Sequence, residues 1–301
     1  MGSATDLSAP MAAPRAPEPI TSRDNRWLKR FHAALAGEPP RRAPEEIGAV
    51  EGVRLVTTAL QSDIEVIALL VSSSGERHLA HLAPLIPPAA RLLSTTDRLF
   101  DYVAATEAPQ GVAALVRPRA AAFDDLVRGI PLVVIMAGVQ DPGNVGTLIR
   151  AAEAFGATGI AACPAAGTGT ANPFGPKVLR ASAGSALRLP ILRGIAAPVV
   201  LAQLRIAGVR IYAASPDVPA APPHSSSKAL TPWEVDWRKP SALLIGNEGA
   251  GLPPDLSRAA DAQVRIPQAA TPFGTAPMDS LNAAIAGGVL LYEAARQRAS
   301  S

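Results

Sequence analysis

The sequence contains a single cysteine, Cys163, among its 301 residues. One thiol excludes both an internal disulfide bond and a cysteine-based zinc site. His78 and His81 are three residues apart and would share a helix face, but no cysteine or carboxylate cluster accompanies them. We therefore expect no metal ion in this protein.

Long hydrophobic runs are also missing. The best candidate, residues 130–139, is far shorter than the roughly 18–20 residues that cross a bilayer, and it is typical of a buried strand. The N-terminus has no compact apolar segment behind a basic start, which a secretory signal would require. These absences predict a cytoplasmic protein without a membrane partner.

Acidic residues are absent from residues 154–216, although the net charge of the whole chain is only +3. The same stretch contains six cationic residues, namely Lys177, Arg180, Arg188, Arg193, Arg205 and Arg210. A long stretch of one sign favours a polyanionic partner, RNA or DNA, because each neutralised phosphate releases counterions. The alternative is a chance distribution in an alanine-rich protein.

Aromatic residues are scarce, at 4%, whereas 48% of the residues are apolar. Much of the apolar share is alanine, so we expect helices to pack closely through small side chains. The length of 301 residues predicts two domains, since a single core rarely keeps growing beyond about 250 residues.

Composition and periodicity divide the chain into four segments. Residues 1–19 are rich in Ala, Pro and Ser, which predicts a disordered tail. Residues 20–118 predict a small mixed domain, residues 119–131 a connection, and residues 132–301 a second domain. Strands alternate with helices in the second domain, which favours a mostly parallel α/β sheet.

Hydrophobic periodicity predicts the individual elements. We expect helices over Asn25–Leu35 and Asn144–Phe155. We expect strands at residues 65–71, 111–116, 132–138, 158–162, 210–214, 241–245 and 262–266.

A proline–glycine turn, Asp141 to Asn144, joins the strand at 132–138 to its helix. Asn144 is well suited to cap that helix. Arg150 follows six residues later, on a helix with few polar residues. Either Arg150 pairs with Glu153 at i+3, or it has a chemical role.

The apolar strand at 241–245 ends in a second turn, Gly246-Asn247-Glu248-Gly249, which carries one carboxylate. Its glycine spacing is close to a dinucleotide-binding fingerprint. Two prolines follow at residues 253 and 254, however, and the turn falls late in the chain, which fits poorly with that motif. Glu248 is either a turn residue or part of a site.

A third strand ends at Ile266-Pro267, and Ser280-Leu281-Asn282 opens the last helix. Ser280 suits the cap position, which would put Asn282 inside the first turn. An i, i+4 stripe of four residues predicts a buried helix face, namely Leu281, Ile285, Val289 and Tyr292.

In this order, the three turns resemble the three motifs of the TrmH/SpoU family of knotted (SPOUT) RNA ribose 2′-O-methyltransferases. The resemblance implies a C-terminal parallel-sheet methyltransferase domain with a trefoil knot, S-adenosyl-L-methionine as the cofactor, and a homodimer. Gly287 and Gly288 each cost about 1 kcal/mol inside a helix relative to alanine. Close backbone contact at the knot or the dimer interface would explain them.

The resemblance also implies the site residues. Five of them would be catalytic, namely Asn144, Arg150, Glu248, Ser280 and Asn282. Four would line the cofactor pocket, namely Ala214, Gly246, Ile266 and Leu281. The family proposal makes the arginine a proton acceptor, but a guanidinium stays protonated in proteins. Our hypothesis is that Arg150 grips a neighbouring phosphate and stabilises the developing alkoxide.

Two further segments resemble RNA-contacting parts of the family. Residues 22–25 with Lys29, and residues 108–112, are similar to the two ends of its N-terminal substrate-binding domain, a small ribosomal-protein-like α/β module. This similarity implies RNA contacts at Arg26 and Lys29. Residues 171–184 resemble a stretch whose implied task is contact with the RNA backbone, through Lys177, Arg180 and Ser182. The alternative for that stretch is a solvated helix face.

The sequence thus predicts methylation of a ribose 2′-hydroxyl in structured RNA. Ribosomal (23S-type) RNA is favoured over transfer RNA, because a ribosomal-protein-like module suits a large structured target. The alternative from another class is an RNA-binding or ribosome-assembly protein that keeps the fold without the reaction. One departure from the family pattern is the long loop Gln268–Asp279, which predicts a reshaped cofactor site.

Overall fold

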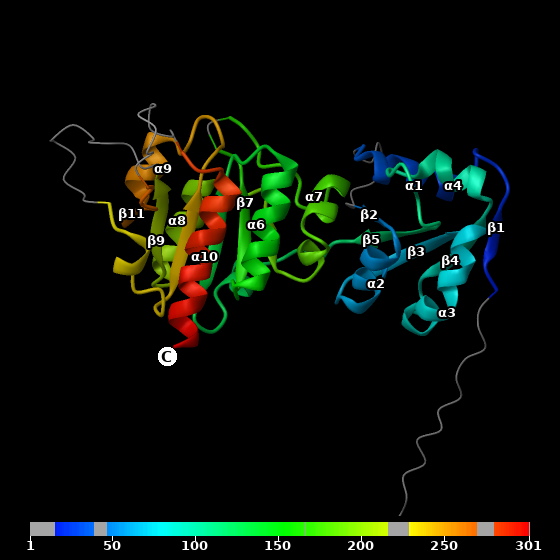
Figure 1. The fold of residues 1–301 in the computed structure, drawn as a ribbon, viewed down its shortest axis with the longest axis horizontal. Helices are drawn as coiled ribbons and strands as arrows, with labels where there is room; N and C mark the ends of the chain where they lie inside the picture. Colours follow the sequence, from blue (N-terminus) through cyan, green and yellow to red (C-terminus); the bar gives the residue numbers. More distant parts are fainter. Residues whose placement is uncertain (1–15, 39–46, 166, 216–228, 270–279, 301) are drawn as a thin grey trace, which may run out of the picture.

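The computed structural model describes residues 16–38, 47–165, 167–215, 229–269 and 280–300. Two β-sheets form the centres of two α/β domains that lie side by side along the molecule (Figure 1). Strands between Glu18 and Arg117 build the first sheet, and strands between Leu132 and Arg265 build the second. The predicted boundaries between tail, domains and connection stay predictions.

The N-terminal sheet has mixed strand directions and the order β1-β4-β3-β5-β2. Its strands are β1 (Glu18–Ile20), β2 (Gly48–Glu51), β3 (Glu65–Ser72), β4 (Arg91–Thr95) and β5 (Val112–Arg117). β1 shows that the predicted disordered tail extends too far, because Glu18 and Pro19 pair with β4. Residues 1–15 of that tail lie outside the described residues.

Helices cover both faces of this sheet. α1 (Arg26–Ala36) and α4 (Asp97–Val103) lie on one face, and α2 (Val53–Gln61) and α3 (Leu79–Leu82) lie on the other (Figure 1). The predicted first helix is confirmed with a shift of one residue, because the side chain of Asn25 caps α1 by accepting from the N–H of Trp27 at 2.8 Å. A left-handed glycine, Gly37, ends the helix.

The C-terminal sheet is parallel throughout, as the alternating pattern predicts, with the order β11-β9-β10-β6-β7-β8. Its strands are β6 (Leu132–Ala137), β7 (Gly159–Cys163), β8 (Ile191–Arg193), β9 (Arg210–Ser215), β10 (Ser241–Ile245) and β11 (Ala262–Arg265). The helices are α5 (Phe123–Leu126), α6 (Pro142–Ala154), α7 (Pro176–Ala181), α8 (Ala197–Ile206), α9 (Pro254–Ala259) and α10 (Ala283–Ala299). The trefoil knot stays a prediction.

Two hydrophobic clusters sandwich this sheet. α6 and α10 bury apolar side chains on one face, and α5, α8 and α9 bury theirs on the other. Because the strands are parallel, their carboxyl ends share one edge of the sheet, where α6 and α10 both begin (Figure 1). That edge is where ligands bind in open parallel sheets.

α10 packs on α6 through a glycine. A Cβ atom at Gly287 would lie 2.3 Å from Cδ2 of Leu148 and 2.7 Å from Cδ1 of Ile245, whereas one at Gly288 would meet nothing within 4 Å. Gly287 is thus in close contact with two side chains of its own chain, and the predicted backbone contact at the knot or the dimer interface stays a prediction.

The predicted burial of the α10 stripe is wrong for this single chain. Ile285, Val289 and Tyr292 are 57%, 40% and 57% exposed, and Leu281 is half-buried. The side of α10 that meets the sheet is formed by residues with a different phase, among them Leu290, Leu291 and Ala294. The i, i+4 spacing identified an apolar stripe, but it pointed to the outer side of the helix.

The two glycines of α10 should respond oppositely to substitution. We expect Gly287→Val to lower the free energy of unfolding by about 1–3 kcal/mol, because the new side chain overlaps Leu148 and Ile245. Gly288→Ala should raise it by up to about 1 kcal/mol, because alanine is the better helix former. Equilibrium unfolding in urea measures both, and equal effects would contradict the packing described above.

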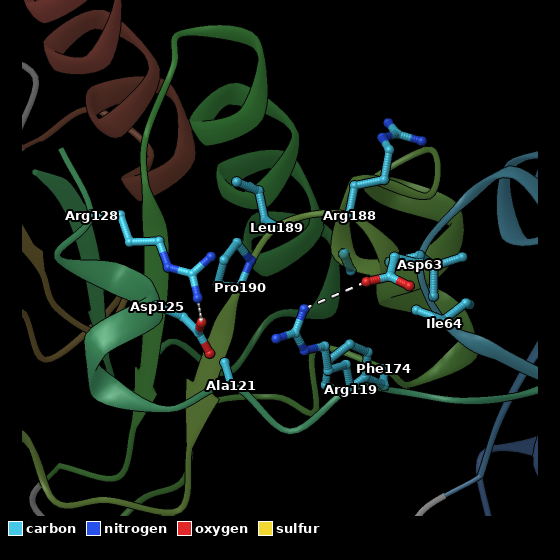
Figure 2. A pocket seen from close by; sticks show the side chains of 12 residues that line it. Asp63, Ile64, Arg119, Ala121, Asp125, Arg128, Phe174, Arg188, Leu189 and Pro190 are labelled. Atoms are coloured by element: carbon cyan, nitrogen blue, oxygen red, sulfur yellow. Dashed lines mark hydrogen bonds and ion pairs between the residues drawn. The ribbon is translucent and has the colours of Figure 1, made fainter.

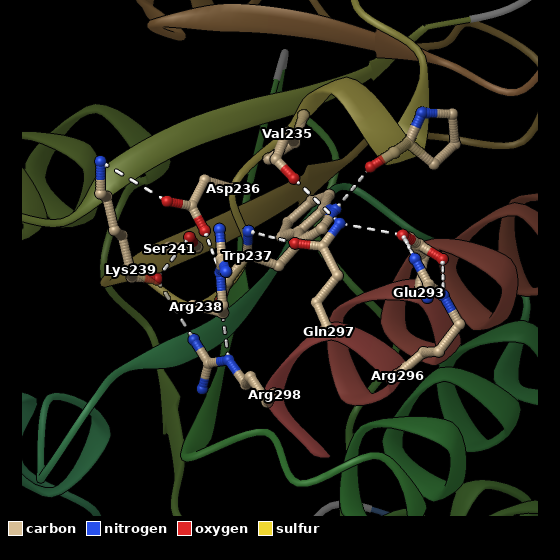
Figure 3. A network of polar contacts seen from close by, with 11 residues as sticks. Val235, Asp236, Trp237, Arg238, Lys239, Ser241, Glu293, Arg296, Gln297 and Arg298 are labelled. Carbon is tan, nitrogen blue, oxygen red and sulfur yellow. Dashed lines mark hydrogen bonds and ion pairs between the residues drawn. The ribbon is translucent and has the colours of Figure 1, made fainter. Parts of the chain in front are cut away.

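The end of α10 is tied to the opposite, amino edge of the sheet (Figure 3). The Arg298 guanidinium donates to four backbone carbonyl oxygens, those of Ile130, Pro131, Trp237 and Lys239, at 2.8–3.3 Å. Gln297 accepts from the N–H of Trp237 and donates to the carbonyl oxygen of Val235. The last helix is therefore anchored where β6 and β10 begin.

A small cavity of about 100 Å³ lies at the junction of the two domains (Figure 2). The Arg119 guanidinium reaches toward the Asp63 carboxylate at 3.6 Å, and Arg128 pairs with Asp125. Leu189 and Pro190, which also line it, immediately precede β8. This cavity is thus placed near the amino edge of the sheet, and its carboxylates are paired.

Candidate active site

A cavity of about 360 Å³ opens at the carboxyl edge of the second sheet. Its walls come from the ends of β9, β10 and β11 and from the start of α10. All four residues predicted to line a cofactor pocket line this cavity, namely Ala214, Gly246, Ile266 and Leu281. Two predicted catalytic residues, Glu248 and Ser280, line it as well. Of the long loop Gln268–Asp279, residues 270–279 lie outside the described residues.

The loop after β10 forms the floor of the cavity and has no room for a side chain at its first residue. A Cβ atom at Gly246 would lie 2.5–2.6 Å from backbone atoms of Gly251 and Leu252. The loop closes on itself because Asn247 and Gly251 exchange backbone hydrogen bonds of 3.0 and 3.1 Å. Only glycine therefore allows this tight return of the chain.

Asn247 was missed as a site residue by the sequence reasoning. Its side-chain oxygen accepts from the N–H groups of Gly249 and Ala250 at 2.9 Å, and its Nδ2 donates to the carbonyl oxygen of Gly138 at 2.9 Å. It thereby ties the cavity loop to the turn after β6. An asparagine within a glycine turn is the available signal, because such side chains bond to backbone groups two residues on.

Three predicted catalytic side chains form one hydrogen-bonded chain beside the cavity. Asn282 Nδ2 donates to Asn144 Oδ1 at 2.9 Å, and Asn144 Nδ2 donates to Glu248 Oε1 at 3.0 Å. The Glu248 carboxylate also accepts from the backbone N–H groups of Asp141 and Gln140, at 3.1 and 3.3 Å. Elements far apart in the sequence thus converge on one carboxylate.

The environment of Glu248 favours its ionised form. Partial burial by itself raises the pKa of this carboxyl, but hydrogen bonds from the Asn144 side chain and from the backbone N–H groups of Glu248, Asp141 and Gln140 outweigh it. The net result is a pKa below the usual range for glutamate. Glu248 is therefore a charged acceptor at neutral pH.

Both helix caps at the site differ from the prediction. Asp141 caps α6, because its Oδ1 accepts from the N–H of Asn144 at 2.8 Å and Pro142 takes the first helical position. Asn282, and not Ser280, caps α10, because its Oδ1 accepts from the N–H groups of Ala284 and Ile285. The side chain of Asn144 is consequently available to Glu248.

Arg150 is not part of this hydrogen-bonded chain. Six residues separate it from Asn144, which corresponds to about 9 Å along the helix and a rotation of about 240°. Its side chain is exposed and has no hydrogen bond or ion pair with any described residue. Glu153, the alternative partner, instead pairs with Arg188 at 2.6 Å. The structural alternative for Arg150 is therefore wrong.

The predicted RNA-contacting residues lie in two places. Lys29 pairs with Asp24 at 2.8 Å, and the Arg26 guanidinium lies 5.6 Å from the centre of the Trp27 ring. Lys177 and Arg180 belong to α7. Ser182, which follows α7, is fully buried and donates to the carbonyl oxygen of Leu179, so the expectation that it contacts RNA is wrong.

Two kinds of feature are absent from the described ranges. No group of three or more His, Cys, Asp or Glu residues there could hold a metal ion. Nor does that part of the chain contain a helix with the length and apolarity to cross a membrane.

Comparison with known proteins gives two matching families. Residues 131–292 match the SpoU rRNA Methylase family, and residues 39–114 match the MRM3-like substrate binding domain. The first match includes the cavity and the amide–carboxylate chain, and the second falls within the N-terminal domain.

Individual relatives match over nearly the whole chain. The 23S rRNA (uridine(2479)-2′-O)-methyltransferase of Streptomyces viridochromogenes is 34% identical over 93% of this chain and 93% of its own. An rRNA methyltransferase from Sinorhizobium meliloti has a crystal structure with a TM-score of 0.75 and 31% identity, covering 93% of this chain and 97% of that one.

One similar protein was solved with its cofactor. The SpoU methyltransferase AviRb from Streptomyces viridochromogenes, in complex with AdoMet, superposes with a TM-score of 0.72 and 28% identity. The superposition covers 92% of this chain and all of that one. The family match extends over more than half of the chain, and the fold agrees with it. The chain belongs to the SpoU rRNA methylase family of methyltransferases.

Proposed function

We propose that the protein transfers a methyl group from S-adenosyl-L-methionine to a ribose 2′-hydroxyl of ribosomal RNA. The observation that carries the proposal is the contact between the cavity at the sheet edge and the Asn282–Asn144–Glu248 chain. The relatives named above are 23S rRNA and rRNA methyltransferases, one of them in complex with AdoMet. The cytoplasm, where ribosomal RNA is assembled with proteins, is the compartment that we propose.

The residues around the cavity suit S-adenosyl-L-methionine. Gly246 keeps the loop backbone at the cavity wall, and the main chain around Ile266 and Leu281 provides donors and acceptors for a flat base. Among the described residues of the wall, Glu248 is the carboxylate, and a cation is stabilised next to it. When bound, the cofactor supplies the methyl group on a positively charged sulfur.

The polar chain is suited to orienting the ribose. Asn144 uses both ends of its amide, so its position is defined by Asn282 on one side and Glu248 on the other. A carboxyl with a lowered pKa is a weak base. We therefore assign Glu248 and the two asparagines to positioning the attacking hydroxyl, together with Ser280, and not to removing its proton.

We assign Arg150 to the phosphate and the developing oxyanion. Its side chain has no hydrogen bond or ion pair with any described residue, so its guanidinium is available to a ligand. Its five donors in a planar fork match a phosphate and act where negative charge develops.

We also propose a homodimer formed through the outer side of α10. Ile285, Val289 and Tyr292 expose an apolar stripe beside α6, and the Tyr292 ring meets the Phe155 ring edge-on at 5.8 Å. Exposed apolar side chains gathered on one helix favour burial against a second copy. Sedimentation velocity tests this, and a monomer at micromolar concentration would argue against it.

Transfer of labelled methyl from S-adenosyl-L-methionine tests the proposed function. Unmodified ribosomal RNA and transfer RNA are offered separately, and the labelled site is mapped by its resistance to alkaline cleavage. Label at one position of ribosomal RNA is the expected result. Label in transfer RNA alone would change the substrate, and no transfer together with no stabilisation by S-adenosylhomocysteine would favour a non-catalytic RNA-binding protein.

Glu248→Gln should slow methyl transfer at pH 7 by about 10- to 100-fold, because an amide offers one acceptor where two carboxylate oxygens now receive three donors. The wild-type rate should show no Glu248 titration between pH 5 and 8. The pKa of Glu248 is lower in the folded protein than in the unfolded chain. The ionised carboxylate therefore stabilises the fold at any pH above the ordinary glutamate pKa, and this stabilisation is lost only as the pH falls through the folded-state pKa. Substitution of an exposed glutamate, Glu107→Gln, is the control. A transfer rate that titrates near pH 6 in the wild type but not in Glu248→Gln would contradict the positioning role of Glu248.

A further inference from the structure

A groove of about 520 Å³ between the two domains has no task in the chemistry described above. The end of α1, with Ile47 and Ala105, forms one side. The segment that leads into α7, with Pro142 at the start of α6, forms the other side. The size is within the ~300–1,000 Å³ of ordinary ligand sites, so the groove has room for part of a nucleic acid strand.

One end of the groove adjoins the candidate active site. Pro142 lines the groove and is the first residue of α6. Asn144, in the same helical turn, donates to Glu248. A polymer whose ribose reaches the Asn282–Asn144–Glu248 chain can therefore continue directly into the groove.

The catalytic side of the groove is held rigidly to α6. A Cβ atom at Gly146 would lie 2.4 Å from Cβ of Ala181 and 3.0 Å from the carbonyl oxygen of Val178. α6 and α7 thus pack with their backbones in near contact. The positions of Lys177 and Arg180 on α7 are consequently defined relative to Asn144 on α6.

Two cations of the groove are free to bind an anion. Within the stretch that has no acidic residues, Arg188 and Arg205 form ion pairs, and Arg193 and Arg210 lie over aromatic rings. The side chains of Lys177 and Arg180 have no hydrogen bond, ion pair or ring contact with any described residue. Glu38 is the acidic residue among those that line the groove in the described part of the chain, so two positive charges face one negative charge.

Apart from Asn172 and two glycines, the remaining lining is apolar. The groove is lined by Leu35, Ala36 and Ala105 on one side and by Pro142 and Pro176 on the other. Flat apolar surface beside phosphate-binding cations is what an unpaired base requires, and proteins recognise specific RNA sites mostly through such unstacked bases. A double helix would instead hold its bases stacked and paired.

We propose that this groove binds the unpaired nucleotides next to the target ribose, with Lys177 and Arg180 on their phosphates. The proposal rests on the proposed function, because the target ribose defines which nucleotides are adjacent. It makes α1 of the N-terminal domain part of the binding site for the modified strand.

Salt dependence of RNA binding tests the two phosphate contacts. The probe is the ribosomal RNA fragment that the wild-type protein methylates. Each single-strand phosphate contact contributes about 0.7 to the slope of log K against log salt, so Lys177→Ala/Arg180→Ala should lower that slope by about 1.4. We expect at least a tenfold rise of KM for RNA and unchanged stabilisation by S-adenosylhomocysteine. Arg210→Ala, from the same stretch but at the start of β9, is the matched control.

Filling the groove tests the strand itself. Ala36→Trp places a bulky ring at the exposed end of α1, and Ala202→Trp does the same on the exposed side of α8 as a control. Only the first should impair methylation, with an unchanged melting temperature for both. A complementary strand annealed beside the target nucleotide should also block methylation of the wild-type protein.

The two proposals fail in different ways. If the wild-type protein methylates the fragment while the groove variants match their controls, or the annealed RNA remains a full substrate, the groove proposal is overturned and the proposed function stands. If the wild-type protein transfers no methyl group to any RNA, the proposed function fails and the groove proposal fails with it.

Discussion

Arg150→Ala should reduce the rate of methyl transfer by about 10²- to 10³-fold, the usual cost of removing one group that stabilises charge in a transition state. The melting temperature should stay unchanged, because the Arg150 side chain is exposed and has no partner among the described residues. Stabilisation by S-adenosylhomocysteine should also persist, because Arg150 does not line the cavity. Single-turnover transfer of labelled methyl measures the effect.

Arg150→Lys tests whether activity requires the planar guanidinium or only a positive charge at this position. Near-full activity of this variant would contradict bidentate contact with a phosphate.

Mixed dimers give a second test of the role of Arg150. Because Arg150 does not line the cavity of its own chain, co-assembly of Arg150→Ala with Asn282→Ala subunits should restore activity if the arginine serves the cavity of the partner subunit. Mixed dimers as inactive as either parent would place its role within one subunit.

Gly246→Ala should abolish binding of the cofactor. The added methyl group would lie 2.5–2.6 Å from the backbone of Gly251 and Leu252, which cannot move without opening the loop that forms the cavity floor. We expect the stabilisation by S-adenosylhomocysteine to vanish and methyl transfer to fall below detection. Thermal unfolding with and without S-adenosylhomocysteine at about 1 mM measures the loss. At a ligand concentration of about 100 Kd or more, binding stabilises the folded protein by about 2.7 kcal/mol.

Gly249→Ala is the matched control in the same loop. Its Cβ atom would meet nothing closer than the Asn247 side-chain oxygen at 3.7 Å, an ordinary contact. Full binding by Gly249→Ala together with no binding by Gly246→Ala is the expected pair of results. If both variants bind equally, the cofactor does not depend on the tight return at Gly246.

Much of the catalytic domain could be predicted from local patterns. Strands that alternate with helices predicted a mostly parallel sheet, and the structure contains it. The resemblance to one family brought Ala214, Gly246, Ile266 and Leu281 together before any geometry was known, and all four line one cavity. These features depend on short segments whose sequence defines their own conformation.

The remaining features depend on contacts between distant segments. Asn144 was predicted to cap α6, but Pro142 takes the first helical position and Asp141 is the cap. The side chain of Asn144 instead donates to Glu248, 104 positions away in the sequence. Asn247 looked like a turn residue, yet it bridges to the carbonyl of Gly138. The apolar stripe of α10 predicted burial, whereas the sheet selected a different side of the helix. Spacing along one helix cannot reveal which side faces the rest of the molecule.

The anchoring of α10 has a consequence for biosynthesis. Asn282 lies at one end of this helix and completes the hydrogen-bonded chain with Glu248, while Arg298 holds the other end to four carbonyl oxygens across the sheet. Both ends follow all the strands of the sheet in the chain, so they are translated after them. The nascent chain therefore cannot assemble its site while those residues are still inside the ribosome. The parallel sheet can therefore form during synthesis before the site is complete.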